Sequence, residues 1–213
     1  MSGPRDADTF PVVDAPDPSV AGDRDATVHG VVLAAGTSSR YGGANKLLAS
    51  VDGEPLVRRA TRPLVASTLE AVIVVVGHDA ERTRRAISGL GVDVVTNGAY
   101  ERGQSTTLAA GIEAAARGAD AAVIGLGDMP DVAAATVDRL VAAYAAGAGT
   151  ALAAACDGRR GNPVLFDAAF FGPLRNVEGD IGGREVFLES DDAALIETGD
   201  PGVLRDVDRP EDL

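Results

Sequence analysis

Short apolar runs alternate with amphipathic stretches from about residue 28 onward, and this alternation restricts the fold more than any other feature. The apolar runs are GVVLAAG at 30–36, AVIVVVG at 71–77, VDVVT at 92–96, AAVIGLG at 121–127 and TALAAAC at 150–156. Such runs are typical of parallel strands buried on both faces. Apolar residues at three- and four-residue spacing predict helices over 55–67, 79–88, 105–117 and 132–146. We therefore expect an α/β fold with three α/β/α layers and a mostly parallel sheet.

The two ends of the chain depart from this alternation. Residues 1–26 contain six Asp, two Arg and four Pro without sustained periodicity, and such a segment cannot bury enough apolar surface to order itself. We expect an acidic, disordered N-terminal tail over 1–26 and a single domain over 27–213. The stretch from Gly161 onward is less regular, and we expect it to be an extension that completes a site.

Charge composition excludes one large class of partner. The chain has 32 Asp and Glu against 19 Lys and Arg, which gives a formal net charge of -13. Nucleic-acid binding needs a basic patch that displaces the counterions of the phosphates, so we expect no nucleic-acid partner. A strongly hydrated acidic surface is typical of halophilic proteins, and we expect a halophilic source. Lys46 is the only lysine beside 18 arginines, which makes its position informative.

Cysteine usage and hydropathy indicate a protein of a reducing compartment. Cys156 is the only cysteine, so it cannot form an internal disulfide, and we expect it to be a small buried residue. The N-terminus has neither the basic nor the apolar region of a signal peptide. The longest uncharged run, 140–156, is short for a bilayer span and contains Gly147 and Gly149. We therefore expect a cytoplasmic protein that does not bind membranes.

The loop after the first apolar run carries the strongest sign of chemistry. Ligands of parallel sheets bind beyond the carboxyl ends of the strands, and here the chain continues as AAGTSSRYGGANKLL over 34–48. Small residues let backbone N–H groups approach an anion, while Arg40 and Lys46 add positive charge. The spacing is neither that of a Walker A loop nor that of a dinucleotide fingerprint. An ordinary glycine-rich turn is the alternative, but the lone lysine favours a polyphosphate site.

Acidic residues follow two later segments. Asp128 comes directly after the run at 121–127, where a buried carboxylate needs a cation. One carboxylate together with substrate phosphates is a common way to hold Mg²⁺, although Asp128 could instead cap the next helix. Asp206 and Asp208 lie near the C-terminus, where strand alternation would place both on one face. Either could complete the metal site, or both could be solvated tail residues.

Four motifs in a fixed order resemble a known family. LAAGTSSRYGGANKLL at 33–48 is similar to the signature of the nucleotidyltransferases with a Rossmann-like core. The other three are GDMP at 127–130, GRRGNPVLF at 158–166 with GDIGGRE at 179–185, and DVDRPEDL at 206–213. In this order they resemble the molybdenum cofactor cytidylyltransferases, over about residues 28–213. The resemblance implies a Rossmann-like sheet of the nucleotidyltransferase, or nucleotide-diphospho-sugar transferase, type.

The resemblance also implies a reaction and its partners. Members of this family transfer CMP from CTP to molybdopterin and release pyrophosphate in an Mg²⁺-dependent reaction. The implied partners are therefore CTP, molybdopterin and a molybdenum hydroxylase that receives the product. Ala34-Ala35-Gly36 goes with CTP in this family, whereas Ala-Gly-Gly goes with GTP in the related guanylyltransferases. The first loop alone does not separate this function from that of a guanylyltransferase or of a transferase acting on another phosphorylated acceptor, such as a sugar phosphate.

Individual roles follow from the same resemblance. Lys46 would reach the α-phosphate and Arg40 the β- and γ-phosphates, and both would be catalytic together with Asp128. Asp128 and Asp206 would hold the metal, with Asp208 as a weaker candidate. The implied acceptor-binding residues are Asn162, Pro163, Asp180 and Arg184. The implied nucleotide-binding residues are Leu33, Ala34, Ala35, Gly36, Thr37, Ser38, Arg40, Lys46, Gly103, Gln104, Ser105, Thr107 and Asp128.

The sequence departs from the motifs of this family at two positions, and a noncatalytic function is the alternative to an enzyme. Tyr41 replaces the usual Met, and Ile181 stands where many members carry a polar or basic residue. A noncatalytic nucleotide-binding subunit attached to a molybdenum hydroxylase is the alternative. The intact Lys46 and Asp128 disfavour it, because a protein that has lost its activity tends to lose its charged groups first.

Overall fold

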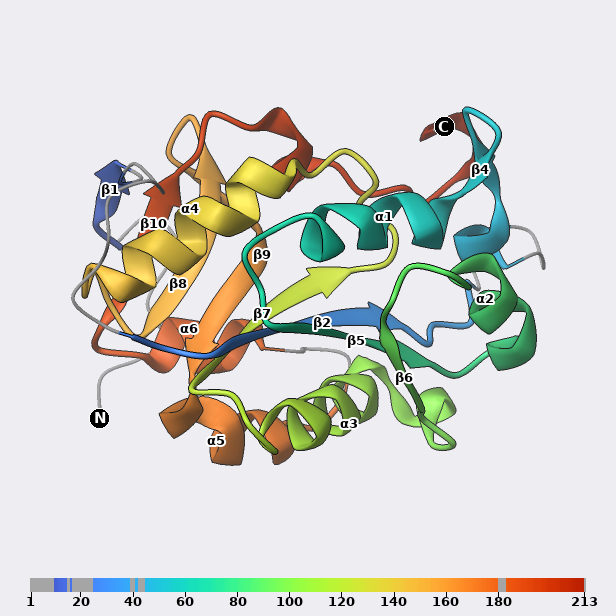
Figure 1. Cartoon of the computed structure of the whole chain (residues 1–213), viewed down its shortest axis with the longest axis horizontal. Coiled ribbons are helices and arrows are strands. Elements are labelled where there is room, and N and C mark those ends of the chain that lie inside the picture. Colours follow the sequence, from blue (N-terminus) through green and yellow to red (C-terminus); the bar gives the residue numbers. More distant parts are fainter. Residues whose placement is uncertain are drawn as a thin grey trace.

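An eight-stranded sheet runs through the centre of the molecule (Figure 1). The computed structural model describes residues 10–14, 16, 25–38, 41, 45–179 and 183–212. In spatial order the strands are β1 (Val12–Asp14), β10 (Ala193–Glu197), β8 (Ala151–Cys156), β9 (Arg159–Asp167), β7 (Ala121–Leu126), β2 (Val28–Ala34), β5 (Ala71–Val76) and β6 (Asp93–Thr96). All neighbours pair in parallel except β9, which is antiparallel to both β7 and β8. The mostly parallel sheet confirms the predicted class.

Helices cover both faces of this sheet, which confirms the three predicted layers (Figure 1). One face carries α1 (Leu56–Val65), α2 (Ala80–Ala86) and α4 (Ala134–Ala145), and the other carries α3 (Gln104–Ala115), α5 (Phe171–Arg175) and α6 (Arg184–Glu189). Strand alternation divides the core between them. In β2, Val32 and Ala34 face the first set of helices, whereas Val31 and Leu33 face the second. A small hairpin of β3 (Ser50–Val51) and β4 (Glu54–Pro55) precedes α1.

The stretch from Gly161 onward is not the irregular extension that the sequence suggested. It belongs in part to β9, which lies in the middle of the sheet, and it also supplies β10. β9 is hard to predict from the sequence because it contains Gly161 and Pro163, and both residue types are rare inside strands. The pairing of β9 is irregular at this point, since Ala153 of β8 pairs with Val164 whereas Ala155 pairs with Arg160. Of the residues between these pairs, Asn162 lines a cavity.

Residues 10–14 also differ from the expected disordered tail. Val12–Asp14 forms β1 at the edge of the sheet, and Leu195 N donates to Pro11 O at 2.9 Å. Phe10 is buried, with its ring centroid 5.0 Å from that of Phe187 in α6. The acidic composition averaged over 1–26 conceals this short apolar segment, which finds a partner strand and an aromatic pocket. The remainder of the expected tail, residues 1–9, 15 and 17–24, lies outside the described residues.

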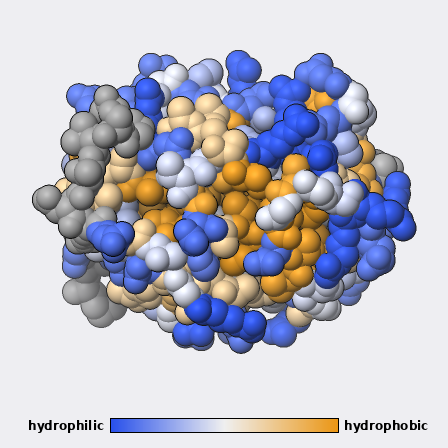
Figure 2. All heavy atoms as spheres, in the orientation of Figure 1, coloured by the Kyte–Doolittle hydropathy of each residue, from blue (hydrophilic) through white to orange (hydrophobic). Residues whose placement is uncertain are grey.

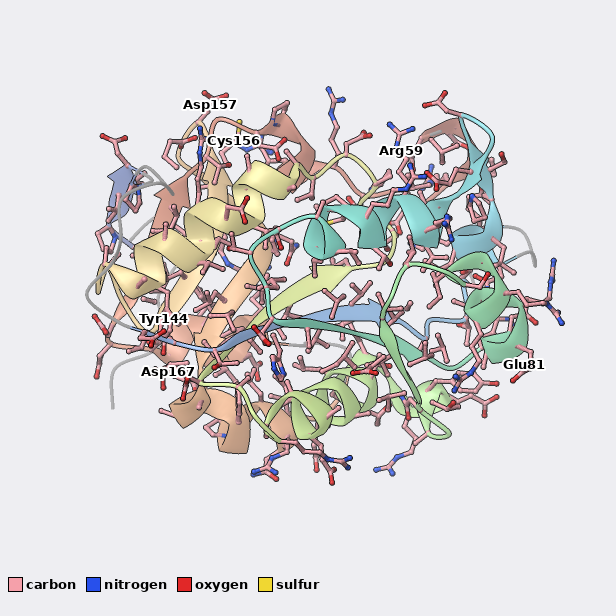
Figure 3. The ribbon with its side chains drawn as sticks, viewed as in Figure 1. Arg59, Glu81, Tyr144, Cys156, Asp157 and Asp167 are labelled. Atoms are coloured by element: carbon pink, nitrogen blue, oxygen red, sulfur yellow. The ribbon has the colours of Figure 1, made fainter. Side chains whose placement is uncertain are left out.

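Side chains at the ends of strands secure the layers. Figure 3 shows Tyr144 of α4 directed toward Asp167 at the end of β9, and the Tyr144 hydroxyl donates to Asp167 Oδ2 at 2.6 Å. Cys156, at the end of β8, is buried as expected. Burial raises the pKa of its thiol, and the nearby carboxylates, Asp157 foremost, add to this shift. A raised pKa keeps the thiol protonated and unreactive at neutral pH.

The surface view in Figure 2 shows apolar residues gathered between α1 and α3, along the edge of the sheet formed by β6. Charged residues surround this area. Within the described ranges, none of the helices has the length and apolar character that crossing a bilayer requires.

Glu197, at the end of β10, accepts hydrogen bonds from backbone N–H groups in the turn between β8 and β9 and so stabilises that turn. Its Oε2 accepts from Gly158 N at 2.8 Å, and its Oε1 accepts from Asp157 N at 3.3 Å and from Gly199 N at 3.0 Å. Burial alone would raise the pKa of Glu197, but the backbone donors hold it below its ordinary value of 4.5. A lowered pKa contributes stability above the unfolded-state value, and that stability is lost as the pH falls through the folded-state value.

We therefore expect Glu197→Gln to lower the free energy of unfolding by about 1 kcal/mol at neutral pH, because charge-assisted hydrogen bonds are replaced by neutral ones. The difference from the wild type should narrow as the pH falls below about 4.5, where the carboxylate of the unfolded chain is protonated. Urea unfolding at a series of pH values measures this difference. A difference that stayed constant from neutral to acidic pH would contradict the role given to Glu197.

Candidate functional site

A cavity of about 370 Å³ opens where β2 and β7 end. This is the edge at which parallel sheets place their ligands. Four segments contribute to its walls: the loop after β2, the segment after β7, the start of α3 and the C-terminal segment. The lining residues are Leu33, Ala35, Gly36, Thr37, Ser38, Tyr41, Lys46, Leu47, Tyr100, Glu101, Gly103, Gln104, Thr107, Leu126, Asp128 and Asp208.

Local hydrogen bonds hold Ser38, Asn45 and the residues around Lys46 in place. Ser38 has a left-handed backbone, with φ of 55°, and its Oγ accepts from Lys46 N at 3.1 Å. Asn45 Oδ1 accepts from Leu47 N at 3.1 Å and so caps the 3₁₀ helix Lys46–Leu48. Leu47 is buried and anchors this short helix in the core. Arg40, which the resemblance implied as a catalytic residue, lies outside the described residues.

Lys46 forms ion pairs with two carboxylates from distant parts of the chain. Its Nζ donates to Asp128 Oδ2 at 2.7 Å and to Asp208 Oδ1 at 3.0 Å. Burial alone would lower the pKa of Lys46, but Asp128 and Asp208 together raise it above its ordinary value of 10.5. The ammonium group is therefore charged throughout the physiological pH range, and it faces into the cavity that the glycine-containing loop also lines.

Asp128 has one carboxylate oxygen without a protein partner. Whereas Oδ2 accepts from Lys46, Oδ1 is buried and has no hydrogen-bond partner among the described residues. Leaving a buried acceptor unsatisfied is unfavourable, so this oxygen is suited to a cation. Backbone bonds fix its position, because Gly127 N donates to Leu33 O at 3.0 Å and Val207 N donates to Asp128 O at 2.9 Å.

The carboxylates fit a divalent cation that is shared with substrate phosphates. Over the described ranges, no group of three or more His, Cys, Asp or Glu residues is placed to hold an ion. Mg²⁺ is commonly bound by one or two carboxylates, with phosphate oxygens and water completing the octahedron. Asp128 and Asp208 could supply such a pair. Asp128 does not cap α4, because Ala133 N at the start of that helix donates to Asp200 Oδ2 at 2.9 Å.

Asp206 does not lie at this cavity, which corrects its expected place beside Asp128. Asp206 lines a separate hollow together with Pro130 and Asp131, whereas Asp208 reaches Lys46. Residues 205–208 form no strand, so the alternation that would place Asp206 and Asp208 on one face does not apply. The C-terminal carboxylate at the site is therefore Asp208.

The start of α3 forms the opposite wall. Gly103 precedes the helix with φ of 110°, and Gln104 and Thr107 line the cavity. Asn97 supports this corner, since its Nδ2 donates to Thr107 Oγ1 at 3.1 Å. Tyr100 also lines the cavity, and its ring centroid lies 6.0 Å from that of His78.

Most of the residues implied as nucleotide-binding share this one cavity. Ala34 and Ser105 are the exceptions within the described residues: Ala34 packs in the core, and Ser105 is buried away from the lining. Sequence reasoning missed Tyr100 and Glu101, whose only signal is that they lie three and two residues before Gly103. The implied residues that line the cavity are Leu33, Ala35, Gly36, Thr37, Ser38, Lys46, Gly103, Gln104, Thr107 and Asp128.

A second cavity of about 200 Å³ adjoins the first and shares Leu33, Gln104 and Leu126 with it. Of the residues implied as acceptor-binding, Asn162 and Arg184 line this cavity. Pro163 is buried and does not line it, and Asp180 lies outside the described residues. The sequence missed Arg160, which also lines this cavity.

Arg59 of α1 braces the segment that follows Asp128 (Figure 3). Its guanidinium forms ion pairs with Asp52 in the β3–β4 turn and, at 3.2 Å, with Asp131. The hydrogen bond with Asp52 is the largest cause of the raised pKa of Arg59. This contact connects the segment after β7 to α1 and to the hairpin.

Comparison with known proteins agrees with this arrangement. The family described as the MobA-like NTP transferase domain matches residues 30–194. Nicotine blue oxidoreductase of Paenarthrobacter nicotinovorans is 30% identical over 194 residues, which are 87% of this chain and 94% of that protein. The bifunctional protein GlmU of Agrobacterium fabrum is 36% identical over 124 residues, which are 57% of this chain but only 27% of GlmU. The chain thus spans about a quarter of the length of this relative.

Solved structures share the fold over nearly the whole chain. Rv0371c of Mycobacterium tuberculosis H37Rv has a TM-score of 0.76 at 28% identity, over 87% of this chain and 95% of that chain. A structure of Rv0371c in complex with manganese has a TM-score of 0.72 at 26% identity, over the same shares of the two chains.

Proposed function

The chain belongs to the MobA-like NTP transferase family, and we propose that it transfers a nucleoside monophosphate from a nucleoside triphosphate to a phosphorylated acceptor, with release of pyrophosphate. The observation that carries this proposal is the position of Lys46 Nζ, 2.7 Å from Asp128 and 3.0 Å from Asp208 at the end of the β2 loop. A fixed cation beside two carboxylates, one of them with an unpartnered oxygen, suits a polyphosphate together with a divalent metal.

The residues of the site suit a reaction that needs no protein nucleophile. A terminal phosphate oxygen of the acceptor is deprotonated at neutral pH and can attack the α-phosphorus in line with the departing pyrophosphate. Lys46 would bind the α-phosphate and offset the charge that develops on it. Backbone N–H groups of Ala35 and Gly36 would bind the other phosphates. Asp128 and Asp208 would hold Mg²⁺, which, when bound, offsets phosphate charge and orients the leaving group.

CTP and molybdopterin are the substrates that we propose. The support for CTP is Ala34-Ala35-Gly36 in the first loop, and the support for molybdopterin is the order of the four motifs. The acceptor would lie at the second cavity, beside Asn162 and Arg184. The similarity to GlmU keeps a second candidate open, namely a transferase that uses GTP or another triphosphate and acts on a different acceptor, such as a sugar phosphate.

A pyrophosphate-release assay tests this function. CTP, GTP, ATP and UTP are each combined with molybdopterin and with a panel of sugar phosphates, with and without Mg²⁺. We expect release with CTP and molybdopterin that requires the metal. Release with a sugar phosphate alone would favour the second candidate, and no release with any pair would contradict nucleotidyl transfer.

A redox assay separates this proposal from the activity named for one relative. The relative that matches over 94% of its own length is called nicotine blue oxidoreductase. The same preparation is therefore incubated with NADH or NADPH and an electron-accepting dye. We expect no oxidation of the reduced nicotinamide above the enzyme-free rate. Turnover here, without pyrophosphate release in the first assay, would favour an oxidoreductase.

The metal and the cellular setting complete the proposal. We propose Mg²⁺ as the physiological ion, although the related Rv0371c protein was solved with manganese. We also propose a halophilic, cytoplasmic protein whose catalytic domain comprises residues 27–213 together with the edge strand β1, and a molybdenum hydroxylase as the receiver of its product. The net charge of -13 supports the halophilic part. Equal activity and stability with and without molar salt would contradict it.

The two C-terminal acids give a paired prediction. Asp208→Asn should lower kcat at least about tenfold and raise the Mg²⁺ concentration needed for half-maximal rate, because a charged ligand becomes neutral. Asp206→Asn is the matched control and should stay within about twofold of the wild type, as expected for a surface change. Pyrophosphate release at several Mg²⁺ concentrations measures both variants. A larger loss in Asp206→Asn than in Asp208→Asn would contradict the assignment of Asp208.

A further inference from the structure

The second cavity combines two arginines with an apolar wall. Arg160 of β9 and Arg184 of α6 both line it. No carboxylate contributes to its lining in the parts of the chain that the structure describes. Two polar residues, Gln104 and Asn162, and Gly183 also line it. The other six lining residues are apolar, namely Leu33, Leu108, Ile124, Leu126, Val164 and Phe166. Two like charges against such a wall repel each other, so the cavity is suited to a negatively charged ligand.

Arg160 is held by an aromatic contact, and its Nε lacks a polar partner in the described ranges. Its Nε is buried with no hydrogen-bond partner among the described residues. Its guanidinium carbon lies 4.8 Å from the ring centroid of Phe187, a stacking contact that orients the guanidinium plane. Burial, reinforced by Arg184, lowers the pKa of Arg160 to about 10, so it is still charged at neutral pH.

The environment of Arg160 differs from that of other arginines in this acidic chain. Arg58, Arg59 and Arg62 of α1 each form an ion pair with a carboxylate. Arg160 contacts an aromatic ring instead, and that ring is itself held by Phe10, 5.0 Å away between centroids. The N-terminal segment thus supports the arginine through Phe187. An oriented guanidinium with an unpartnered buried N–H is suited to an anion.

We propose that the cavity lined by Arg160 and Arg184 binds an anionic group of the acceptor other than the phosphate that reacts. This inference rests on the proposed function. Because the two cavities share Leu33, Gln104 and Leu126, one acceptor molecule can span both of them. The chemical class is a phosphorylated compound that has a flat ring system and a second negatively charged group apart from the phosphate that reacts.

Fluorescence titration with 1-naphthyl phosphate tests this subsite on the full chain. The probe has a flat apolar body and one anionic group, and 1-naphthalenemethanol is its neutral counterpart. The protein contains no tryptophan, so the naphthyl group can be excited selectively. Titrations are made with and without saturating CTP, on the wild type and on Arg160→Gln, Arg184→Gln and Lys46→Ala. Arg159→Gln is the matched control, because Arg159 is the neighbour of Arg160 in β9 but does not line the cavity.

We expect saturable binding of the phosphate probe that persists with CTP present. Arg160→Gln and Arg184→Gln should each weaken this binding at least about tenfold, the size of a lost charge-assisted hydrogen bond. Arg159→Gln and Lys46→Ala should bind as the wild type does, and the neutral probe should bind more weakly than the phosphate. Arg184 is exposed, so its variant remains informative if Arg160→Gln folds poorly.

Two results would overturn the subsite. One is binding that is equal in the wild type and in both cavity variants, or undetectable in all of them. The other is binding lost in Lys46→Ala and retained in the arginine variants, because the probe would then occupy the first cavity. The proposed function fails separately, in the pyrophosphate-release assay. Probe binding as expected, without release from any triphosphate, would leave the anion subsite standing and remove only the transferase.

Discussion

Lys46→Ala should lower kcat for pyrophosphate release about a thousandfold, the upper range for loss of a single charged group that stabilises a transition state. Lys46 is the only cationic side chain among the described residues that line the first cavity. Its raised pKa keeps it charged at the pH of the assay. The fold should persist, since Lys46 lies in a one-turn 3₁₀ helix whose core anchor is Leu47. Initial rates with CTP and molybdopterin measure the effect, and circular dichroism checks the fold.

Lys46→Arg is the matched control for charge. It keeps the positive charge but replaces a compact ammonium with a planar guanidinium, which would fit the same two carboxylates with a different geometry. We expect a rate between those of the wild type and Lys46→Ala. Near-normal release in a folded Lys46→Ala variant would remove Lys46 from the mechanism.

Asp128→Asn should lower metal-dependent turnover about a hundredfold or more, because a ligand on the cation loses its charge. The change also removes the negative charge that Lys46 contacts at 2.7 Å, so the lysine is held less firmly in place. Titration of the rate with Mg²⁺ and of bound Mn²⁺ by electron paramagnetic resonance, with CTP present, measures the two consequences separately.

Asp131→Asn serves as the neighbouring control for Asp128→Asn. Asp131 lies three residues further on and forms an ion pair with Arg59, outside the first cavity. Its loss should change the rate by less than about threefold, as expected for a partly exposed ion pair. An Asp128→Asn variant with the metal dependence of the wild type would show that the cation binds elsewhere.

Periodicity made the central part of the fold predictable. The helices expected over 55–67, 79–88, 105–117 and 132–146 correspond to α1, α2, α3 and α4, with ends that differ by a few residues. Four of the five apolar runs form buried strands as predicted, because continuous apolar runs have few other structural solutions. The fifth forms β6, which lies at the edge of the sheet and is partly exposed. Residues after two of those strands, β2 and β7, line the first cavity.

Long-range contacts made the remainder unpredictable. Lys46 and Asp208 are 162 residues apart, and their contact depends on the path of the C-terminal segment. Gly161 and Gly202 set that path, because a Cβ at either position would collide with a backbone carbonyl. Val207, buried between the two acids, then turns Asp208 toward the cavity. A pattern of alternating acids carries none of this information.

The role of Arg160 could not be predicted from the sequence for a different reason. Its position in the sequence, beside Arg159 and before Gly161, resembles an ordinary charged turn at the surface. Only packing reveals that it lies beside Phe187 and has an unpartnered Nε. The apolar residues near the N-terminus were hidden in the same way, by the acidic composition around them.

Phosphorus NMR of one reaction mixture tests nucleotidyl transfer most directly. The protein is incubated with CTP, molybdopterin and Mg²⁺, and the three phosphorus resonances of CTP are followed with time. We predict equal amounts of pyrophosphate and of a new diphosphate-linked product that contains the α-phosphorus, with both formed about a thousandfold more slowly by Lys46→Ala. Orthophosphate and CDP in place of pyrophosphate, or no change in the CTP resonances, would contradict attack at the α-phosphorus and with it the function proposed for this site.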